Sequence, residues 1–125
     1  MPSDARLNAT KRIELIFYRS PSGREPVREW LRELSLADCK IVGNDLQTVE
    51  FGWPIGIPLC AQMTGSPGLW ECRSTLSSRR IARVLFMVSH RQLIALHGFI
   101  KKTRHTPRKD IQLARHRMKE EQRHA

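Results

Sequence analysis

Apolar and polar residues alternate along four stretches of the chain, which is the pattern of strands that bury one face. In the first stretch, KRIELIFYR at residues 11–19, the apolar Ile13, Leu15 and Phe17 share one side. Three more stretches occur in the second half of the chain: LWECRSTL (69–76), RIARVLFMV (80–88) and QLIALHGFI (92–100). Only three residues separate each of these from the next, and connections this short join antiparallel neighbours. The pattern predicts an N-terminal strand and a later antiparallel meander of three strands.

Two stretches after the first strand repeat apolar residues every three or four positions, which is the period of an amphipathic helix. The first stripe consists of Val27, Trp30, Leu31 and Leu34. It follows Pro26, and proline suits the first helical position because the backbone N–H it lacks would be unpaired there. The second stripe consists of Cys39, Val42, Leu46 and Val49. Gly52 is suited to end that helix, so we expect a short hairpin of two helices.

Residues 52–68 interrupt these regular patterns. The segment holds four glycines and three prolines, a density that predicts a surface loop without regular structure through most of its length. Near the C-terminus, Thr106 suits a helix cap and Pro107 a first helical residue. The apolar face of that helix consists of Ile111, Ala114 and Met118. The predicted order is β-α-α-β-β-β-α, an α+β fold in which a small antiparallel-rich sheet carries the helical hairpin on one face, followed by a C-terminal helix.

A chain of 125 residues has room for one hydrophobic core, and 40% hydrophobic residues suffice to fill it. We expect one domain over residues 11–120, after a flexible leader (1–10) and before a polar tail (121–125). The N-terminus lacks the apolar segment of a signal peptide, and no stretch approaches the roughly 20 apolar residues of a membrane span. Three cysteines without C-x-x-C spacing argue against a disulfide framework or a zinc site. These features predict a cytoplasmic protein with reduced thiols and no membrane partner.

Positive charge is concentrated in one part of the chain. Residues 1–71 contain eight Lys and Arg against nine Asp and Glu, whereas residues 72–109 contain ten Lys and Arg and no acid. Residues 110–125 add four basic and three acidic residues, so the formal net charge of +10 comes almost entirely from the acid-free block. An uncompensated block of this kind attracts phosphates and steers association with nucleic acid. A solubilising face, or a surface covered by an acidic partner, is the alternative interpretation.

Strand alternation places two of these arginines on the same face of the meander. The apolar row of the second strand in the meander consists of Ala82, Val84, Phe86 and Val88. Arg83 therefore points to the opposite side. In the preceding strand Arg73 lies on the polar row, whereas Trp70 shares the parity of apolar residues and is expected to be a core anchor rather than a platform for RNA bases. Because helices usually cover one face of such a sheet, we expect both arginines on the accessible face.

Three segments carry a resemblance to a known family: GLWECR (68–73), ARVLF (82–86) and LHGFIKKTRHTPRKDIQLA (96–114). The third is the most specific, because Leu-His-Gly-Phe, then Lys-Lys-Thr, then Thr-Pro before a helix form a long pattern with fixed spacing. Together with the order of elements around them, these segments resemble the phage-derived branch of the RelE/HigB toxins of toxin–antitoxin modules. The resemblance spans residues 12–119, which is nearly the whole predicted domain.

The resemblance implies a ribosome-dependent endoribonuclease that cleaves messenger RNA on the translating ribosome and is held inactive by a cognate antitoxin, expected to be of the helix-turn-helix type. It implies a reaction without metal or cofactor, in which the 2′-hydroxyl of the substrate attacks the adjacent phosphate in line. Phosphoryl transfer gains most from positioning and from cations aimed at the phosphate oxygens. A basic cleft suits that chemistry because arginine binds those oxygens through two N–H groups and lysine acts as a point charge.

Five residues are candidates for catalysis. By resemblance, Arg83 matches the strand arginine that contacts the scissile phosphate, and Lys101 or Lys102 matches the basic residue at the end of the last strand. Arg73 falls where related toxins place a basic residue proposed to act on the 2′-hydroxyl. Because arginine stays protonated near pH 7, Arg73 is suited to orient the nucleophile rather than to deprotonate it. His97, of a residue type with a pKa of about 6.5, is the better proton carrier, and a histidine hydrogen-bonded within its strand is the alternative interpretation.

Four further residues are candidates for RNA binding: Arg79, Arg80, Phe99 and Arg104. Phe99 shares the side of His97 and Lys101, so it is suited either to stack on a base or to lie buried under the last helix. The remaining histidines lack the spacing of metal-ligand pairs, and no metal is expected. Two rival functions stay open, because the fold alone does not decide between them: a ParE-like toxin that inhibits DNA gyrase without enzymatic activity, and a nucleic-acid-binding module without toxicity.

Overall fold

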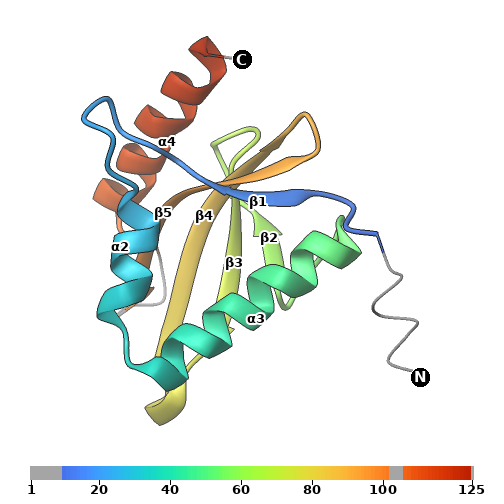
Figure 1. Cartoon of the computed structure of the whole chain (residues 1–125), viewed down its shortest axis with the longest axis vertical. Helices are drawn as coiled ribbons and strands as arrows, with labels where there is room; N and C mark the ends of the chain where they lie inside the picture. Colours follow the sequence, from blue (N-terminus) through green and yellow to red (C-terminus); the bar gives the residue numbers. More distant parts are fainter. Residues whose placement is uncertain (1–9, 102–105, 125) are drawn as a thin grey trace.

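The computed structural model describes residues 10–101 and 106–124, and within them the chain forms five strands and three α-helices (Figure 1). The strands are β1 (Glu14–Phe17), β2 (Cys60–Gln62), β3 (Trp70–Thr75), β4 (Ile81–Ser89) and β5 (Gln92–Lys101). The helices are α2 (Pro26–Glu33), α3 (Leu36–Gly52) and α4 (Arg108–Arg123). A short 3-10 turn, η1 (Ser77–Arg79), joins β3 to β4.

The strands form one sheet in the order β1-β5-β4-β3-β2. β1 runs parallel to β5, and the other three neighbouring pairs are antiparallel. The predicted meander is present as β3-β4-β5, and the predicted α+β fold is confirmed. β4 is the central strand and β5 lies beside it, so the alternation of their residues between the two faces decides what each face presents.

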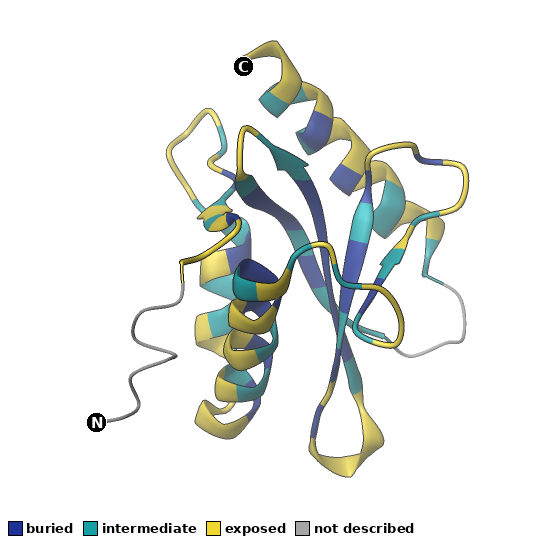
Figure 2. Ribbon diagram, turned by 90° about the vertical axis from the view of Figure 1, so that its right-hand side faces the viewer, coloured by how far each residue is buried: buried dark blue, intermediate teal, exposed yellow. Residues whose placement is uncertain are grey.

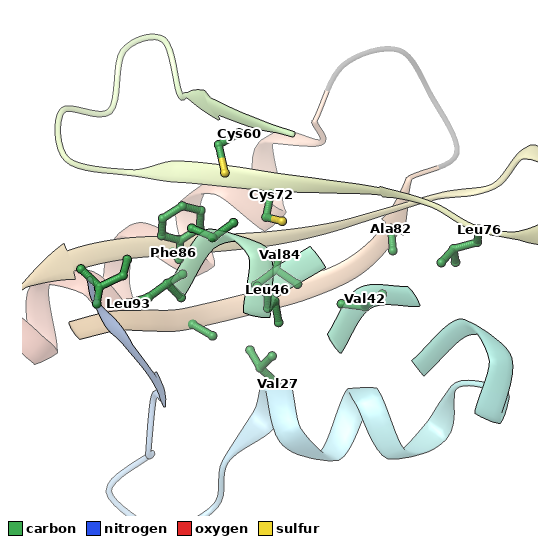
Figure 3. Close-up of a cluster of buried hydrophobic side chains, with 13 residues drawn as sticks. Val27, Val42, Leu46, Cys60, Cys72, Leu76, Ala82, Val84, Phe86 and Leu93 are labelled. Atoms are coloured by element: carbon green, nitrogen blue, oxygen red, sulfur yellow. The ribbon is translucent and has the colours of Figure 1, made fainter. Parts of the chain in front are cut away.

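Helices α2 and α3 cover one face of the sheet. Pro26 is the first residue of α2, as predicted, and the Ser35 hydroxyl caps α3 by accepting a hydrogen bond from the backbone N–H of Asp38. The core on this face combines the predicted helix stripes with the apolar rows of the strands: Val27, Val42, Leu46, Val49, Cys72, Ala82, Val84 and Phe86. Figure 3 shows side chains of this core between the strands and the two helices.

Helix α4 covers part of the opposite face. Its buried residues Ala114 and Met118 belong to a second core with strand residues of the other parity: Leu85, Met87, Ile94 and Leu96. In the view of Figure 2 the sheet lies between α2 and α3 on one side and α4 on the other. The sheet face that carries Arg73 and Arg83 was expected to be accessible. It is open to solvent only in the part that α4 does not cover.

Two local expectations need correction. β2 lies inside the segment expected to be largely irregular, because its backbone pairs with β3, a distant contact that three residues do not reveal in their own sequence. Helix α4 begins at Arg108, and Pro107 holds the cap position with extended backbone (ψ 141°) and no side-chain cap, so the roles predicted for Thr106 and Pro107 are wrong by one residue. α4 also continues to Arg123, into the predicted polar tail.

Gly98, in the Leu-His-Gly-Phe segment, allows α2 to approach β5. A Cβ atom added at this position would overlap the ring of Trp30, with Cδ2 at 3.0 Å and two ring atoms closer still. Because a strand backbone and a packed indole have little room to move apart, we expect Gly98→Ala to destabilise the protein by about 1–3 kcal/mol. Chemical denaturation with urea measures this change.

A matched control is available in α3. Gly43 has no neighbour within 4 Å of an added Cβ, so Gly43→Ala is expected to stabilise the protein by roughly 0.5–1 kcal/mol through helix propensity. Replacing Trp30 by leucine in the Gly98→Ala background should recover part of the loss. If Gly98→Ala were as stable as the wild type, the packing of α2 on β5 would leave room for a side chain at residue 98, which contradicts this prediction.

Candidate functional site

A pocket of about 490 Å³ opens on the face of the sheet that α4 leaves uncovered. The floor of the pocket comes from β3, β4 and the end of β5. Its walls come from β2 with the loop that follows it, and from Thr106 and Ile111 at the start of α4. The polar residues that line it are Gln62, Thr64, Glu71, Arg73, Arg83, Lys101 and Thr106. Three of the five catalytic candidates therefore lie together in one pocket.

The alternation of the strands brings the two arginines together, as expected. Arg73 of β3 and Arg83 of β4 are directly opposite each other in the register of the antiparallel pair. Lys101 of β5 lies opposite Ile81, two residues from Arg83 and therefore on the same face. The three cations come from three adjacent strands, so the sheet backbone fixes their relative positions.

A buried carboxylate, Glu71, holds both arginines. Its Oε1 accepts a hydrogen bond from Nε of Arg73 at 2.9 Å, and Nη2 of Arg73 lies 2.8 Å from the same oxygen in an ion pair. Its Oε2 accepts a hydrogen bond from Nη1 of Arg83 at 2.5 Å. The Glu71 side chain is only 3% exposed and that of Arg83 11%, whereas 39% of Arg73 is exposed to solvent. Glu71 thus fixes Arg83 deep in the pocket and Arg73 at its mouth.

The pocket keeps a positive balance despite this carboxylate. Three cations, Arg73, Arg83 and Lys101, face one carboxylate, Glu71, which leaves a formal charge of +2 from these four groups. Burial lowers the pKa of Lys101, and the nearby guanidinium of Arg83 lowers it further. Nε of Arg83 is buried and has no hydrogen-bond partner within the part of the chain that the structure describes. Such a site favours an anionic ligand with several acceptor oxygens.

Sequence reasoning missed Glu71 as a site residue. Glu71 has polar parity in β3, since it alternates with Trp70 and Cys72, but it lies just outside the acid-free block, which begins one residue later. The available signal was a lone acid at polar parity, two residues before Arg73. A carboxylate between arginines on a half-buried face is expected to pair with them, since buried charges are paired.

His97 lies beside the pocket rather than among its lining residues. Its Nε2 donates a hydrogen bond to Oδ1 of Asp110, in the first turn of α4, at 2.6 Å. Its ring stacks on that of Phe99, with centroids 5.4 Å apart, and Phe99 packs against the core under α4. This arrangement corresponds to the alternative interpretations of both residues, a hydrogen-bonded histidine and a packed phenylalanine, and it ties β5 to α4.

The environment of His97 predicts a pH-dependent stability. Burial lowers the pKa of His97, and the hydrogen bond to Asp110 offsets only part of that effect. Because the folded pKa lies below the unfolded value of about 6.5, the stabilising contribution is complete above that pH and is lost as pH falls through the folded pKa. The free energy of unfolding should therefore decrease below pH 6.5, and His97→Gln should reduce this slope. His124→Gln, at the exposed C-terminal end of α4, serves as the control.

Arg79 and Arg80, two candidates for RNA binding, lie at the tip of the β3–β4 hairpin. Nη2 of Arg80 donates a hydrogen bond to Oδ2 of the buried Asp38 at 2.6 Å, and this contact points toward α3, away from the pocket. Arg80 therefore joins the hairpin to the helical face, and its guanidinium lowers the pKa of Asp38. Arg79 is exposed. Lys102 and Arg104 lie outside the described residues.

Two further features are absent from residues 10–101 and 106–124. No group of three or more His, Cys, Asp or Glu side chains is arranged to hold a metal ion. No α-helix in these ranges combines the length and apolar character needed to cross a membrane.

Comparison with known proteins identifies one family. The chain matches the family described as "Phage derived protein Gp49-like (DUF891)" over residues 29–119, which include both arginines, Glu71 and Lys101. A search of the curated proteins finds no match.

Proposed function

Because this chain belongs to the phage-derived Gp49-like family, we propose that it is a HigB-like toxin that cleaves messenger RNA on the translating ribosome. The observation that carries this proposal is the pocket in which Glu71 holds Arg73 and Arg83 next to Lys101. Its chemistry suits a phosphodiester, because several fixed cations face a site with room for a phosphate and its neighbouring groups.

In the proposed reaction, the RNA 2′-hydroxyl attacks the adjacent phosphorus and the bond to the 5′-oxygen of the next nucleotide breaks. The products are a 2′,3′-cyclic phosphate and a free 5′-hydroxyl. Arg83 binds the non-bridging oxygens on which charge develops, since Glu71 holds its planar guanidinium in one orientation. Arg73, at the mouth of the pocket, binds the same phosphate and aligns the nucleophile.

One group in the pocket is suited to move a proton of this reaction. Glu71, 3% exposed and paired through its two oxygens with Arg73 and Arg83, keeps these guanidinium groups in place, and the proton of the 2′-hydroxyl passes to water at the mouth of the pocket. Lys101 donates a proton to the departing 5′-oxygen, and its lowered pKa makes that donation easier. His97 instead holds the first turn of α4 against β5, since Asp110 occupies its Nε2.

The exposed surface of α4 favours a polyanionic partner. Its exposed charged residues are all basic within the described helix, whereas its three acids are partly buried. The exposed Lys and Arg are Arg108, Lys109, Arg115, Lys119 and Arg123. A basic surface of this kind steers the protein toward RNA and makes binding weaken as salt rises.

Translating ribosomes and purified protein provide the direct test. We expect the wild type to cut the message and Lys101→Ala to cut it more slowly, by about 10²-fold or more if Lys101 is the general acid. Lys40→Ala removes an exposed lysine on α3, on the other face of the sheet from the pocket and α4, and serves as the matched control, with wild-type cleavage. Primer extension on the message maps the cuts, and intact message with the wild-type protein would reject the proposal.

The same preparation separates the rival functions. Inhibition of DNA gyrase without RNA cleavage would favour a ParE-like toxin, and salt-dependent RNA binding without growth arrest would favour a simple binding module. The proposed function also implies an antitoxin, expected to carry a helix-turn-helix domain. Co-expression with the product of the adjacent reading frame should relieve growth arrest.

A further inference from the structure

Two buried cysteines face each other across the strand pair that forms one wall of the pocket. Cys60 of β2 and Cys72 of β3 are partners in the antiparallel register and are 0% and 1% exposed. The thiol of Cys72 lowers the pKa of the Cys60 thiol, and the thiol of Cys60 raises that of Cys72. Figure 3 shows the two side chains at the edge of the core, one from each strand. The proposed cleavage reaction uses neither thiol.

The backbone hydrogen bonds show which kind of pair this is. Arg73 donates its N–H to the carbonyl of Leu59, and Met63 donates to Leu69, both at 2.8 Å. In an antiparallel ladder the bonded pairs alternate with non-bonded pairs, so the register makes Cys60 and Cys72 a non-hydrogen-bonded pair. Cα atoms of such pairs lie about 4.5 Å apart with their side chains close together. That separation falls within the roughly 4.4–6.8 Å that disulfides span.

We propose that Cys60 and Cys72 form a reversible disulfide when the protein meets a small-molecule disulfide such as oxidised glutathione. This site is independent of the proposed RNA cleavage. The bond fits the folded sheet, because the two residues already have the register and spacing of a cross-strand disulfide. The third cysteine, Cys39 on α3, is partly exposed and is not included in the pair.

The chemistry is a two-step thiol–disulfide exchange. The Cys60 thiolate attacks one sulfur of oxidised glutathione, which forms a mixed disulfide and releases one glutathione thiolate. The Cys72 thiolate then attacks the Cys60 sulfur, forms the protein disulfide and releases the second glutathione. The two cysteines together lose two protons and two electrons. Oxidised glutathione takes up these protons and electrons and becomes two molecules of reduced glutathione. Cys60 reacts first because the thiol of Cys72 lowers its pKa and because it lies on the edge strand.

Access to the buried pair comes from opening of β2. This strand has three residues, lies at the edge of the sheet and pairs only with β3. Short edge strands with few contacts open locally at low free-energy cost. Oxidation should therefore be slower than modification of Cys39, and urea below the unfolding transition should accelerate it. Once formed, the disulfide holds β2 and the lining residues 61–64 against β3.

The experiment uses the full-length reduced protein incubated with oxidised glutathione at neutral pH. We expect intact mass to fall by two hydrogens in a Cys39→Ser variant, and non-reducing peptide maps of the wild type to contain the Cys60–Cys72 linked peptide. Reduction should restore the original mass. The closed loop over residues 60–72 should raise Tm by roughly 5–15 °C in the oxidised form.

Two outcomes would overturn the proposal. One is a native protein that keeps both thiols free while Cys39 becomes glutathionylated, and the other is a mixed disulfide at Cys60 that never resolves. Cys72→Ser provides the control, since it should stop at the mixed disulfide. The wild-type peptide map decides the question even if that variant fails to fold. Because no readout involves RNA, loss of this proposal and loss of the proposed function are distinguishable.

Discussion

Arg83→Lys is expected to lower the rate of message cleavage by about 10²–10³-fold while the protein stays folded. Lysine keeps the positive charge beside the buried Glu71, so the ion pair can persist. It lacks the planar pair of N–H groups that binds two phosphate oxygens together, and the transition state loses that contact. Single-turnover cleavage on programmed ribosomes measures the rate, and circular dichroism with thermal unfolding checks the fold.

The control for this prediction is Arg115→Lys. Arg115 is exposed on α4 and does not line the pocket, so cleavage should match the wild type. Arg83→Lys with a wild-type rate would mean that residue 83 supplies charge alone, or that it has only a structural role. If Arg83→Lys both cleaves slowly and unfolds at a lower temperature, its cleavage rate is compared with that of Arg83→Met. That second variant removes the charge at residue 83 without leaving a cavity.

Glu71→Ala is expected to reduce the free energy of unfolding by about 3–5 kcal/mol. Removal of this carboxylate leaves the Arg83 guanidinium buried without its counterion and places Arg73 next to it with no negative charge between them. The loss arises from the uncompensated charge, because breaking a buried pair costs far more than its net contribution to stability. Urea denaturation at neutral pH measures it.

Two further variants test the cause of that loss. Glu29→Ala breaks an ion pair with Arg24 whose side chains are 36% and 71% exposed, so it should have little effect. The double change Glu71→Leu with Arg83→Met removes both buried charges and should recover much of the lost stability. If Glu71→Ala alone were as stable as the wild type, water would have to reach Arg83 in the folded protein.

Local pattern was sufficient for most of the fold. The alternation in residues 80–88 and 92–100 predicted two strands, and the stripe from Val42 to Val49 predicted a helix with one buried face, because that information is contained in the spacing of the residues. The alternation did not reveal that both faces of β4 and β5 are buried, since the second face is covered by α4. The strand β2 was not predictable in this way. Three residues between prolines and glycines become a strand only because β3 offers them an unpaired edge.

In the candidate site, too, local pattern predicts some features, and contacts between distant segments decide the others. Parity predicts that Arg73 and Arg83 share a face, since both strands are antiparallel neighbours in a meander. It does not reveal that His97 turns to Asp110, because that contact depends on where α4 returns to the sheet. Nor does it reveal that Arg80 reaches Asp38, a residue on a helix that precedes it by 42 positions.

By itself, the sequence determined the order of all elements except β2, the relative parity of the strand residues and the concentration of positive charge after residue 71, because these follow from local spacing and composition. Only the tertiary structure decided which of the charged residues meet. It placed Glu71 between two arginines, kept Lys101 with them and directed His97 and Arg80 to partners outside the pocket. The physical reason is that ion pairs and hydrogen bonds act over a few ångströms, and that proximity is set by the packing of distant segments.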